Sequence, residues 1–367
     1  MKHSPQEIRI GLDPGSSLTK VVYALDGTLQ YFWMEPEVLA LPVRPTHLGT
    51  VDFCADPEHQ AWLQLPQDEN FYAVGQLAHQ FKAIARLDKL KYEQALYKIL
   101  AAIGAIVQRE QVSGKFIVKL ATVLPYGEYL NGQQLKQQLA AALKGFEFRG
   151  QRMKGTLDDF FCLPEGGGHA WRLIQQYSKS WFKKRVVVIL MVGHRDISCL
   201  TFRHGTVDPS HSQTTALGFT ELLQHIIHLT AGLDETIAST VFQIGQNYQP
   251  NNPLVRSLVR STQPLNVERE AQEICEAIRV ARLEYGSLVK NWLDKTLPRS
   301  LEAIIVGGGA SFYLKDELTQ ILSWAVPIWS EPLDLDAVDG KGQLLNHRMA
   351  DIAHLFDSCL MQQPQAV

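Results

Sequence analysis

The stretch that decides the fold is Asp13-Pro14-Gly15-Ser16-Ser17, which lies between two apolar runs, Ile8–Leu12 and Leu18–Leu25. Both runs have the composition of strands, so the sequence predicts a β-hairpin with the quoted stretch as its turn. The backbone N–H groups of such a tight turn can form a nest that holds phosphate. Gly15 would let a ligand approach the backbone closely. An ordinary Gly/Ser turn is the alternative interpretation of this segment taken alone.

Two charged side chains accompany the predicted turn. Asp13 provides a carboxylate beside which a hydrated Mg²⁺ can sit. Lys20 follows on the same hairpin and can reach a phosphate as a point charge. The hairpin therefore predicts a phosphate site with a nearby metal.

Composition limits the class of protein. The chain has 367 residues, enough for two domains of ordinary size. It is 46% hydrophobic and 20% charged, as in a soluble globular protein, with a net charge of −3. A broad nucleic-acid-binding surface is therefore not expected. The five cysteines are odd in number and lack metal-binding spacing, so they are interpreted as reduced cytosolic thiols.

Neither a signal peptide nor a membrane span is predicted. The first residues, Met1–Pro5, contain no apolar segment of the kind found in signal peptides. The longest strongly apolar run, Val186–Val192, is far too short to cross a bilayer. These observations predict a cytoplasmic protein.

The strand pattern of the N-terminal hairpin occurs a second time in the chain. Asp26-Gly27 is a strong hairpin signal and leads to a third strand, Thr28–Trp33. Later, Arg185–Val192 and Ile197–Phe202 flank the turn Gly193-His194-Arg195-Asp196. The repeat predicts a duplicated α/β fold with a cleft between its halves, in which two hairpin turns clamp phosphates.

Helical periodicity completes the outline. The predicted helices are Tyr92–Gln108, 131–144, a segment through Trp171 and Tyr177, 217–231, 268–293 and Asn346–Met361. Thr214 or Thr215 is the expected N-cap of the helix at 217–231. Residues 35–70 and 247–268 are expected to be mostly loop.

Four segments, in order along the chain, resemble motifs of the superfamily that contains actin, sugar kinases and heat-shock ATPases. Ile10–Lys20 resembles the first phosphate motif, with its lysine seven residues after the aspartate, and Val186–Phe202 occupies the place of the second. Ile304–Ala310 resembles the adenosine motif, and Asn346–Met349 the second connecting motif.

Within that superfamily the chain is most similar to bacterial plasmid-segregation actins of the ParM/StbA type. That similarity is carried by Tyr72–Ala78, Leu124–Tyr129 and Leu163–Ala170. It implies a duplicated actin-like (ribonuclease H-like) α/β fold, with two domains flanking a nucleotide cleft. Residues 1–180 would form domain I, with the C-terminal helix 346–367 packing back on it. Residues 181–345 would form domain II.

The resemblance also implies roles for individual residues. Nucleotide binding is assigned to Asp13, Gly15, Ser16, Ser17, Lys20, Gly193, Gly307, Gly308, Gly309 and Ala310. Asp13 would hold Mg²⁺ through water, and Glu165 would be the catalytic residue that orients the attacking water. The alternative for Glu165 is a carboxylate favoured at a helix N-terminus. The alternative for the glycine run is a flexible connector between strand and helix.

One position departs from the family pattern. The second phosphate motif of the family has an aspartate two residues before its glycine, whereas this chain has Met191 before Gly193. A thioether is no ligand for a hard cation. Asp196 on the same turn is a possible substitute, or simply a turn residue. Nucleotide binding is therefore better supported than hydrolysis, and ATPase activity is left open.

The resulting prediction is an actin-like protein that forms filaments with ATP (or GTP) and Mg²⁺. Its role would be plasmid or DNA segregation, or a related cytoskeletal task, with DNA contacted through an adaptor protein. The alternative is a degenerate actin homologue that acts as a structural partner without hydrolysis. A small-molecule kinase is disfavoured because no convincing catalytic aspartate is found for it.

Overall fold

The computed structural model describes residues 5–48, 54–66, 68–83, 89–330 and 346–361. The chain divides into two compact units. Unit 1 comprises Met1–Arg172 and Asp351–Val367, and unit 2 comprises Leu173–Ala350. The assignment of functional domains to residues 1–180 and 181–345 stays a prediction.

The described strands of unit 1 form a nine-stranded sheet in the order β3-β2-β1-β7-β9-β8-β5-β6-β4. Their bounds are β1 Gln6–Pro14, β2 Thr19–Leu25, β3 Thr28–Met34, β4 Val38–Leu41, β5 Trp62–Gln64, β6 Phe71–Val74, β7 Lys115–Leu124, β8 Phe146–Phe148 and β9 Gln151–Pro164. Strand β1 is antiparallel to β2 and parallel to β7, which is in turn parallel to β9.

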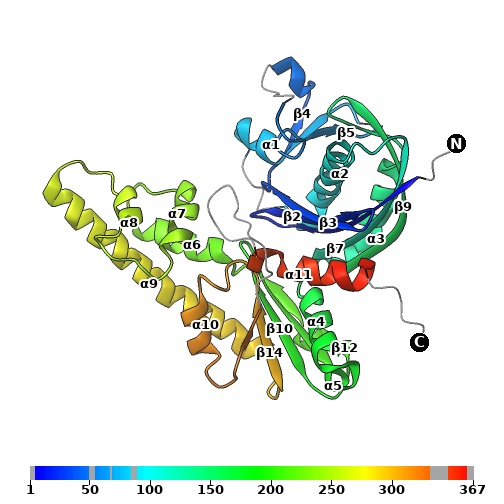
Figure 1. Ribbon diagram of the computed structural model, residues 1–367. Coiled ribbons are helices and arrows are strands. Elements are labelled where there is room, and N and C mark those ends of the chain that lie inside the picture. The colour runs from blue at the N-terminus through cyan, green and yellow to red at the C-terminus, as the bar shows by residue number, and fades with distance from the viewer. Residues whose placement is uncertain (1–4, 49–53, 67, 84–88, 331–345, 362–367) are drawn as a thin grey trace. The chain divides into compact units, whose positions relative to one another are not determined.

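This sheet curls around helix α2, Lys91–Arg109, which contacts strands on both sides of the curve (Figure 1). The other helices of unit 1 are α1 Gln76–Gln80, α3 Gly132–Ala142, the start of α4 Gly167–Tyr177 and the end of α11 Asn346–Phe356, with single turns η1 Pro45–Leu48, η2 Tyr129–Asn131 and η5 Asp357–Met361. The turn η5 contacts β1, because Arg9 donates a hydrogen bond to the carbonyl oxygen of Leu360 at 2.9 Å.

Unit 2 contains a six-stranded sheet whose main path is β12-β11-β10-β14-β15, with β13 paired to β11. The strands are β10 Val187–Val192, β11 Ile197–Arg203, β12 Thr206–Val207, β13 Gln213–Thr215, β14 Ala303–Gly307 and β15 Ile328–Trp329. The order and directions along this path match those of β3-β2-β1-β7-β9: two antiparallel pairs followed by two parallel pairs. The predicted duplication of an α/β unit is therefore confirmed.

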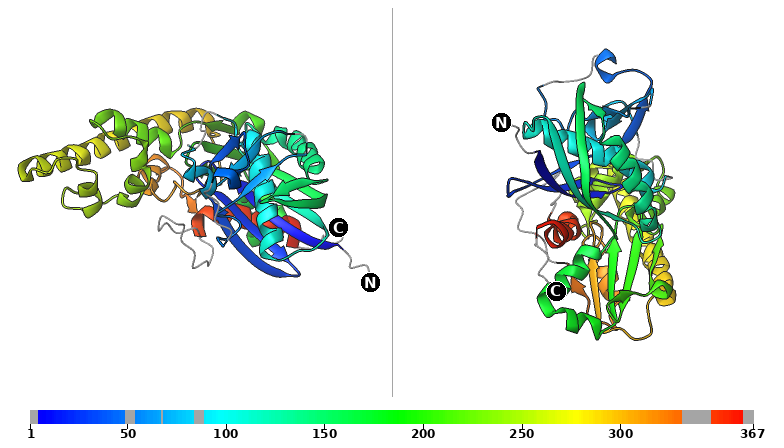
Figure 2. Two further views of the ribbon diagram at one scale, coloured as in Figure 1. Left: turned by 90° about the horizontal axis from the view of Figure 1, so that it is seen from above. Right: turned by 90° about the vertical axis from the view of Figure 1, so that its right-hand side faces the viewer.

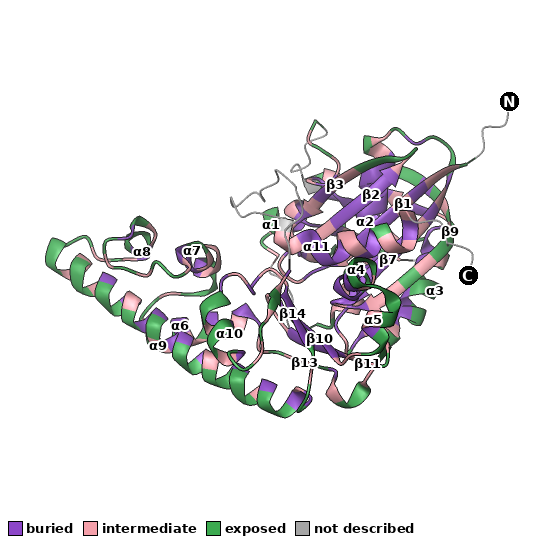
Figure 3. Cartoon of the chain, turned by 60° about the horizontal axis from the view of Figure 1, so that its bottom comes forward, coloured by how far each residue is buried: buried purple, intermediate pink, exposed green. Residues whose placement is uncertain are grey.

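The helices of unit 2 are the end of α4, α5 Lys179–Lys183, α6 Phe219–Leu229, α7 Ala238–Ile244, α8 Pro253–Ser257, α9 Pro264–Thr296, α10 Lys315–Ile321 and the start of α11, with turns η3 Pro209–His211 and η4 Glu235–Ile237. Helix α9 is a single long rod (Figure 2). Its buried residues recur along one side and its exposed residues along the other (Figure 3). Among its apolar residues, Ile278 and Tyr285 are buried, whereas Leu288 is exposed.

Several sequence-based boundaries were wrong. Asp13 and Pro14 are the last residues of β1 rather than part of the turn, because Asp13 pairs with Lys20 across the hairpin. The expectation that residues 35–70 and 247–268 are mostly loop agrees with the described residues, although the first range contains β4, η1 and β5 and the second contains α8 and the first turn of α9. The N-cap of α6 is Gly218, since Thr214 and Thr215 belong to β13.

In the part of the chain that the structure describes, every helix is too short or too polar to cross a membrane.

Two glycines in the middle of helices predict opposite responses to the same substitution. A Cβ atom at Gly104 of α2 would lie 2.3 Å from the Cγ atom of Phe148, whereas one at Gly286 of α9 would meet no atom within 4 Å. Gly104→Ala should therefore destabilise the protein by about 1–3 kcal/mol through overpacking. Gly286→Ala should stabilise it by up to about 1 kcal/mol through helix propensity. Urea unfolding followed by circular dichroism measures both; a stabilising Gly104→Ala would contradict the packing of α2.

Candidate functional site

Three parallel strands of unit 1 bring the predicted site residues to one edge of the sheet. Strand β1 ends at Pro14, β7 at Leu124 and β9 at Pro164. Ligands of open α/β sheets bind outside the carboxyl ends of such strands. Asp13 and Glu165 both lie at this edge, so the structure brings together two residues that are far apart in the sequence.

The hairpin register explains the spacing of Asp13 and Lys20. The two residues are direct cross-strand partners on β1 and β2, and the Lys20 ammonium forms an ion pair with Oδ2 of Asp13. Each side chain is only 13% exposed. The spacing of the two charged residues is thus a property of the hairpin itself.

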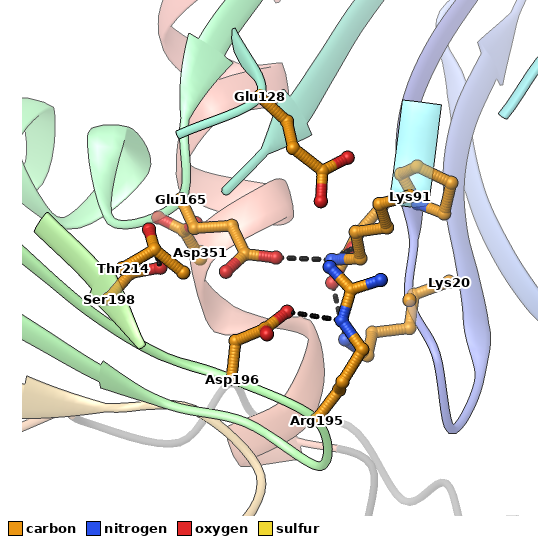
Figure 4. Close-up of polar contacts among 12 residues, drawn as sticks. Lys20, Lys91, Glu128, Glu165, Arg195, Asp196, Ser198, Thr214 and Asp351 are labelled. Carbon is orange, nitrogen blue, oxygen red and sulfur yellow. Dashed lines mark hydrogen bonds and ion pairs between the residues drawn. The ribbon is translucent and has the colours of Figure 1, made fainter. Parts of the chain in front are cut away.

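Lys91 is the site residue that sequence reasoning missed. It is the first residue of α2, and its Nζ atom lies 3.0 Å from Oδ1 of Asp13. The same ammonium pairs with Oε1 of Glu165 (Figure 4). Its side chain is 8% exposed. The sequence gives no signal for this role, because a lysine before an amphipathic helix is usually a solvated residue.

The electrostatics of the cluster are those of tightly paired charges. Burial alone would raise the pKa of Asp13, but the ammonium groups of Lys20 and Lys91 hold it well below its usual range. Burial alone would lower the pKa of Lys91, but the carboxylates of Asp13 and Glu165 raise it above its usual range. Asp13 and Lys91 are therefore both charged near neutral pH.

A second lysine of α2 supports the turn between β1 and β2. Lys98 is buried, and its ammonium donates to the carbonyl oxygens of Pro14 and Gly15, at 3.4 and 2.9 Å. Gly15 has no room for a side chain, since a Cβ atom would lie 2.3 Å from the carbonyl oxygen of Leu18. Ser16 and Ser17 are half-buried. The turn is thus short, tightly packed and placed over a buried cation.

Asp351 connects the last helix to the residues that follow Glu165. Its carboxylate accepts hydrogen bonds from the backbone N–H groups of Gly166 at 2.8 Å and His169 at 3.2 Å. Burial raises the pKa of Asp351 to about 6, and the negative charges of Asp13 and Glu165 add to the rise. The carboxylate that satisfies the N-terminus of α4 is therefore that of Asp351, whereas Glu165 pairs with Lys91.

The second predicted turn, in unit 2, packs on the start of α6. The N–H group of Gly193 donates to the carbonyl oxygen of Asp196 at 2.9 Å, and Phe219 donates to the carbonyl oxygen of Gly193 at 3.1 Å. The Asp196 carboxylate pairs with Nε of Arg195 at 2.7 Å. Met191 lies within β10, so the position where the family has a carboxylate carries none.

The glycine run after β14 lies close to the end of β10. Gly308 has φ of 93°, and a Cβ atom there would lie 2.4 Å from the carbonyl oxygen of Val192. Ala310 donates to that same carbonyl oxygen at 3.0 Å. Unit 2 therefore brings Gly307–Ala310 beside the strand that leads to Gly193. The backbone alone requires glycine at position 308, so this residue type is not by itself a sign of a nucleotide.

The carboxylates assigned to magnesium do not fit that ion as they are arranged. Mg²⁺ needs oxygen ligands in a nearly ideal octahedron. Both oxygens of Asp13 face ammonium groups, and Asp196 is paired with Arg195. Within the described ranges, no group of three or more His, Cys, Asp or Glu side chains is placed to hold a metal.

The raised pKa of Asp351 predicts a pH dependence of stability. The folded protein binds more protons than the unfolded chain between pH 3.8 and about 6. The free energy of unfolding that Asp351 contributes is thus fully present below this window. It is lost as pH rises through the window, by about 3 kcal/mol in total. Asp351→Asn should remove this dependence of the free energy of unfolding on pH. As pH rises through the window, the free energy of unfolding of the variant relative to the natural protein should therefore rise by that amount. Urea unfolding of both proteins across the window measures it; a constant difference would contradict the assignment.

Comparison with known proteins supports the fold. No protein-family model matches the chain, and no curated protein sequence matches it. Among solved structures, the actin-like protein Alp7A matches with a TM-score of 0.64 and 13% identity, over 96% of this chain and 95% of that one. A ParM from a 15-stranded filament of Clostridium botulinum matches with a TM-score of 0.59 and 14% identity, over 96% and 98%.

Bacillus thuringiensis ParM with ATP matches with a TM-score of 0.57 and 12% identity, over 96% of this chain and 99% of that one. These matches extend over nearly the whole of each chain, and at such identities they establish the fold. The predicted actin-like fold is therefore confirmed: this chain has the α/β fold of the actin-like proteins ParM and Alp7A.

Proposed function

We propose that this protein binds a nucleoside triphosphate, ATP or GTP, at the turn between β1 and β2, and that it assembles with copies of itself into filaments. The observation that carries the proposal is the turn itself, which is closed by Gly15, underlain by the buried Lys98 ammonium and flanked by Lys20. Two proteins that share this fold support it, a ParM solved with ATP and a ParM solved as a filament.

The proposed roles follow from the chemistry of each group. Backbone N–H groups at Gly15, Ser16 and Ser17 would donate to phosphate oxygens, and Lys20 would offset phosphate charge. In unit 2, the nucleotide-binding roles expected for Gly193 and the segment Gly307–Ala310 stay predictions. Glu165 would orient a water if hydrolysis occurs, since phosphoryl transfer depends mainly on positioning and charge stabilisation.

Magnesium is not part of this proposal, because both carboxylate oxygens of Asp13 are already paired with ammonium groups. The cellular role that fits such a protein is DNA or plasmid segregation, or a related cytoskeletal task in the cytoplasm. DNA would be contacted through an adaptor protein, because a chain with a net charge of −3 offers no broad basic surface.

A second candidate function is a scaffold that binds nucleotide without hydrolysing it. Three observations favour it: Met191 stands where the family has a carboxylate, Asp196 pairs with Arg195, and the Glu165 carboxylate pairs with Lys91. Each of them removes or occupies an acid that could otherwise activate water or hold a metal.

Phosphate release recorded together with light scattering separates the two candidates. With ATP or GTP, the filament-forming ATPase should show turnover and rising scattering, and the scaffold should show scattering without turnover. Neither signal, together with an unchanged melting temperature in the presence of nucleotide, would contradict the proposed function.

Lys20→Gln tests the phosphate site directly. Removing a charge-assisted contact to phosphate should weaken nucleotide binding by about 1.5–3 kcal/mol, or roughly 10- to 150-fold. The matched control is Lys119→Gln on β7, because Lys119 is also ion-paired, but with Glu7, Asp158 and Asp159. Isothermal titration calorimetry measures both; equal affinities of the two variants would rule out Lys20 as a phosphate ligand.

A further inference from the structure

The Lys91 ammonium occupies the space between two carboxylates that come from different strands. Asp13 is near the end of β1, and Glu165 directly follows β9. Lys91 reaches both from the start of α2, at 3.0 Å from Oδ1 of Asp13 and in an ion pair with Oε1 of Glu165. Its side chain is only 8% exposed. One fixed positive charge therefore joins three elements of unit 1.

Two carboxylates that converge in this way are the usual ligands of a hard divalent cation. Here each carboxylate already faces an ammonium group, and Asp13 faces two. A divalent ion that approached Asp13 would have to displace an ion pair and would be repelled by Lys20 and Lys91. The carboxylates of Asp13 and Glu165 thus already have cationic side chains as partners, and no metal is needed to balance their charge.

The Lys91 ammonium lies where a positive charge is unfavourable, and its ion pairs with Asp13 and Glu165 offset this unfavourable free energy. A cation at the first position of a helix is opposed by the helix dipole. At the same helix end, Glu128 is buried and accepts a hydrogen bond from the backbone N–H of Tyr92 at 3.0 Å. Glu93 likewise accepts a hydrogen bond from the backbone N–H of Leu90 at 3.2 Å. Carboxylates therefore satisfy the N-terminus of α2, while the Lys91 side chain points to Glu165 (Figure 4) and also reaches Asp13.

Unit 2 shows the same arrangement independently. The acidic residue of its turn, Asp196, is paired with Arg195 at 2.7 Å, and both side chains are largely buried, at 14% and 13% exposed. In each unit, therefore, the carboxylate beside the candidate phosphate turn has a cationic side chain as its partner.

We propose that Lys91 is a tethered cation that takes the place of a divalent metal at the Asp13–Glu165 pair, so that this site binds the triphosphate without Mg²⁺. The proposal rests on the proposed function for its nucleotide, but the exclusion of metal by Lys91 is testable without any nucleotide. The proposal also predicts that removal of the Lys91 ammonium converts the two carboxylates into a metal site.

The metal arm uses Mn²⁺ and electron paramagnetic resonance of the nucleotide-free protein. The natural protein should leave the spectrum of free Mn²⁺ unchanged, and Lys91→Gln should bind Mn²⁺ in a way that a further Asp13→Asn change abolishes. Lys98→Gln is the matched control, because Lys98 lies on the same helix but contacts carbonyl groups of the turn. It should gain no Mn²⁺ site. Binding of Mn²⁺ by the natural protein that Asp13→Asn abolishes would overturn the proposal.

The nucleotide arm compares ATP binding by calorimetry in excess EDTA and in Mg²⁺. The affinity of the natural protein should change by less than about fivefold, the low end of coupling between two ligands. A larger loss in EDTA would overturn the proposal. Absence of ATP and GTP binding in both buffers, with the Mn²⁺ results as expected, would instead refute the proposed function and leave metal exclusion intact.

Folding of the variants does not decide the outcome. Lys91→Gln removes a buried cation that pairs with two carboxylates and is expected to lose stability. Lys91→Arg keeps the charge and should behave as the natural protein does in both arms. The Mn²⁺ and ATP experiments on the natural protein need no Lys91 variant. If Lys91→Gln misfolds, these experiments still support or overturn the proposal.

Discussion

The bridge of Lys91 to Asp13 and Glu165 is the interaction on which the rest of the candidate site depends. It ties the start of α2 to the carboxyl ends of β1 and β9, and α2 is the helix around which the sheet of unit 1 curls. Removing one partner of such a buried group typically costs about 3–5 kcal/mol, because a charge is left without compensation. The same charges are the basis of the proposed exclusion of divalent cations from the cluster.

The architecture of the protein was predictable because strand order and hairpin turns are local properties. The turn signals at Asp26-Gly27 and at Gly193–Asp196 each lie between apolar runs, so the two meanders and their duplication could be inferred. The register of β1 on β2 then places Lys20 opposite Asp13, which explains a spacing that the sequence showed only as a pattern.

The ion pairs of the site were not predictable because they join residues far apart in the chain. Lys91 and Lys98 precede or interrupt an apolar helical pattern, and nothing in that pattern indicates that their ammonium groups reach β1. Asp351 likewise lies in the last helix but accepts N–H groups at the start of α4. Conversely, Gly308 was assigned to nucleotide binding, and its positive φ and its closeness to Val192 already account for a glycine there.

The central claim is that the turn between β1 and β2, supported by α2, receives the phosphates. Hydrogen–deuterium exchange of the natural protein with and without ATP tests it most directly. The account predicts slower exchange in peptides that cover residues 15–18 and 91–98, because phosphate oxygens would engage the turn and stabilise the lysines behind it. Bound ATP that leaves exchange in both segments unchanged would contradict the account.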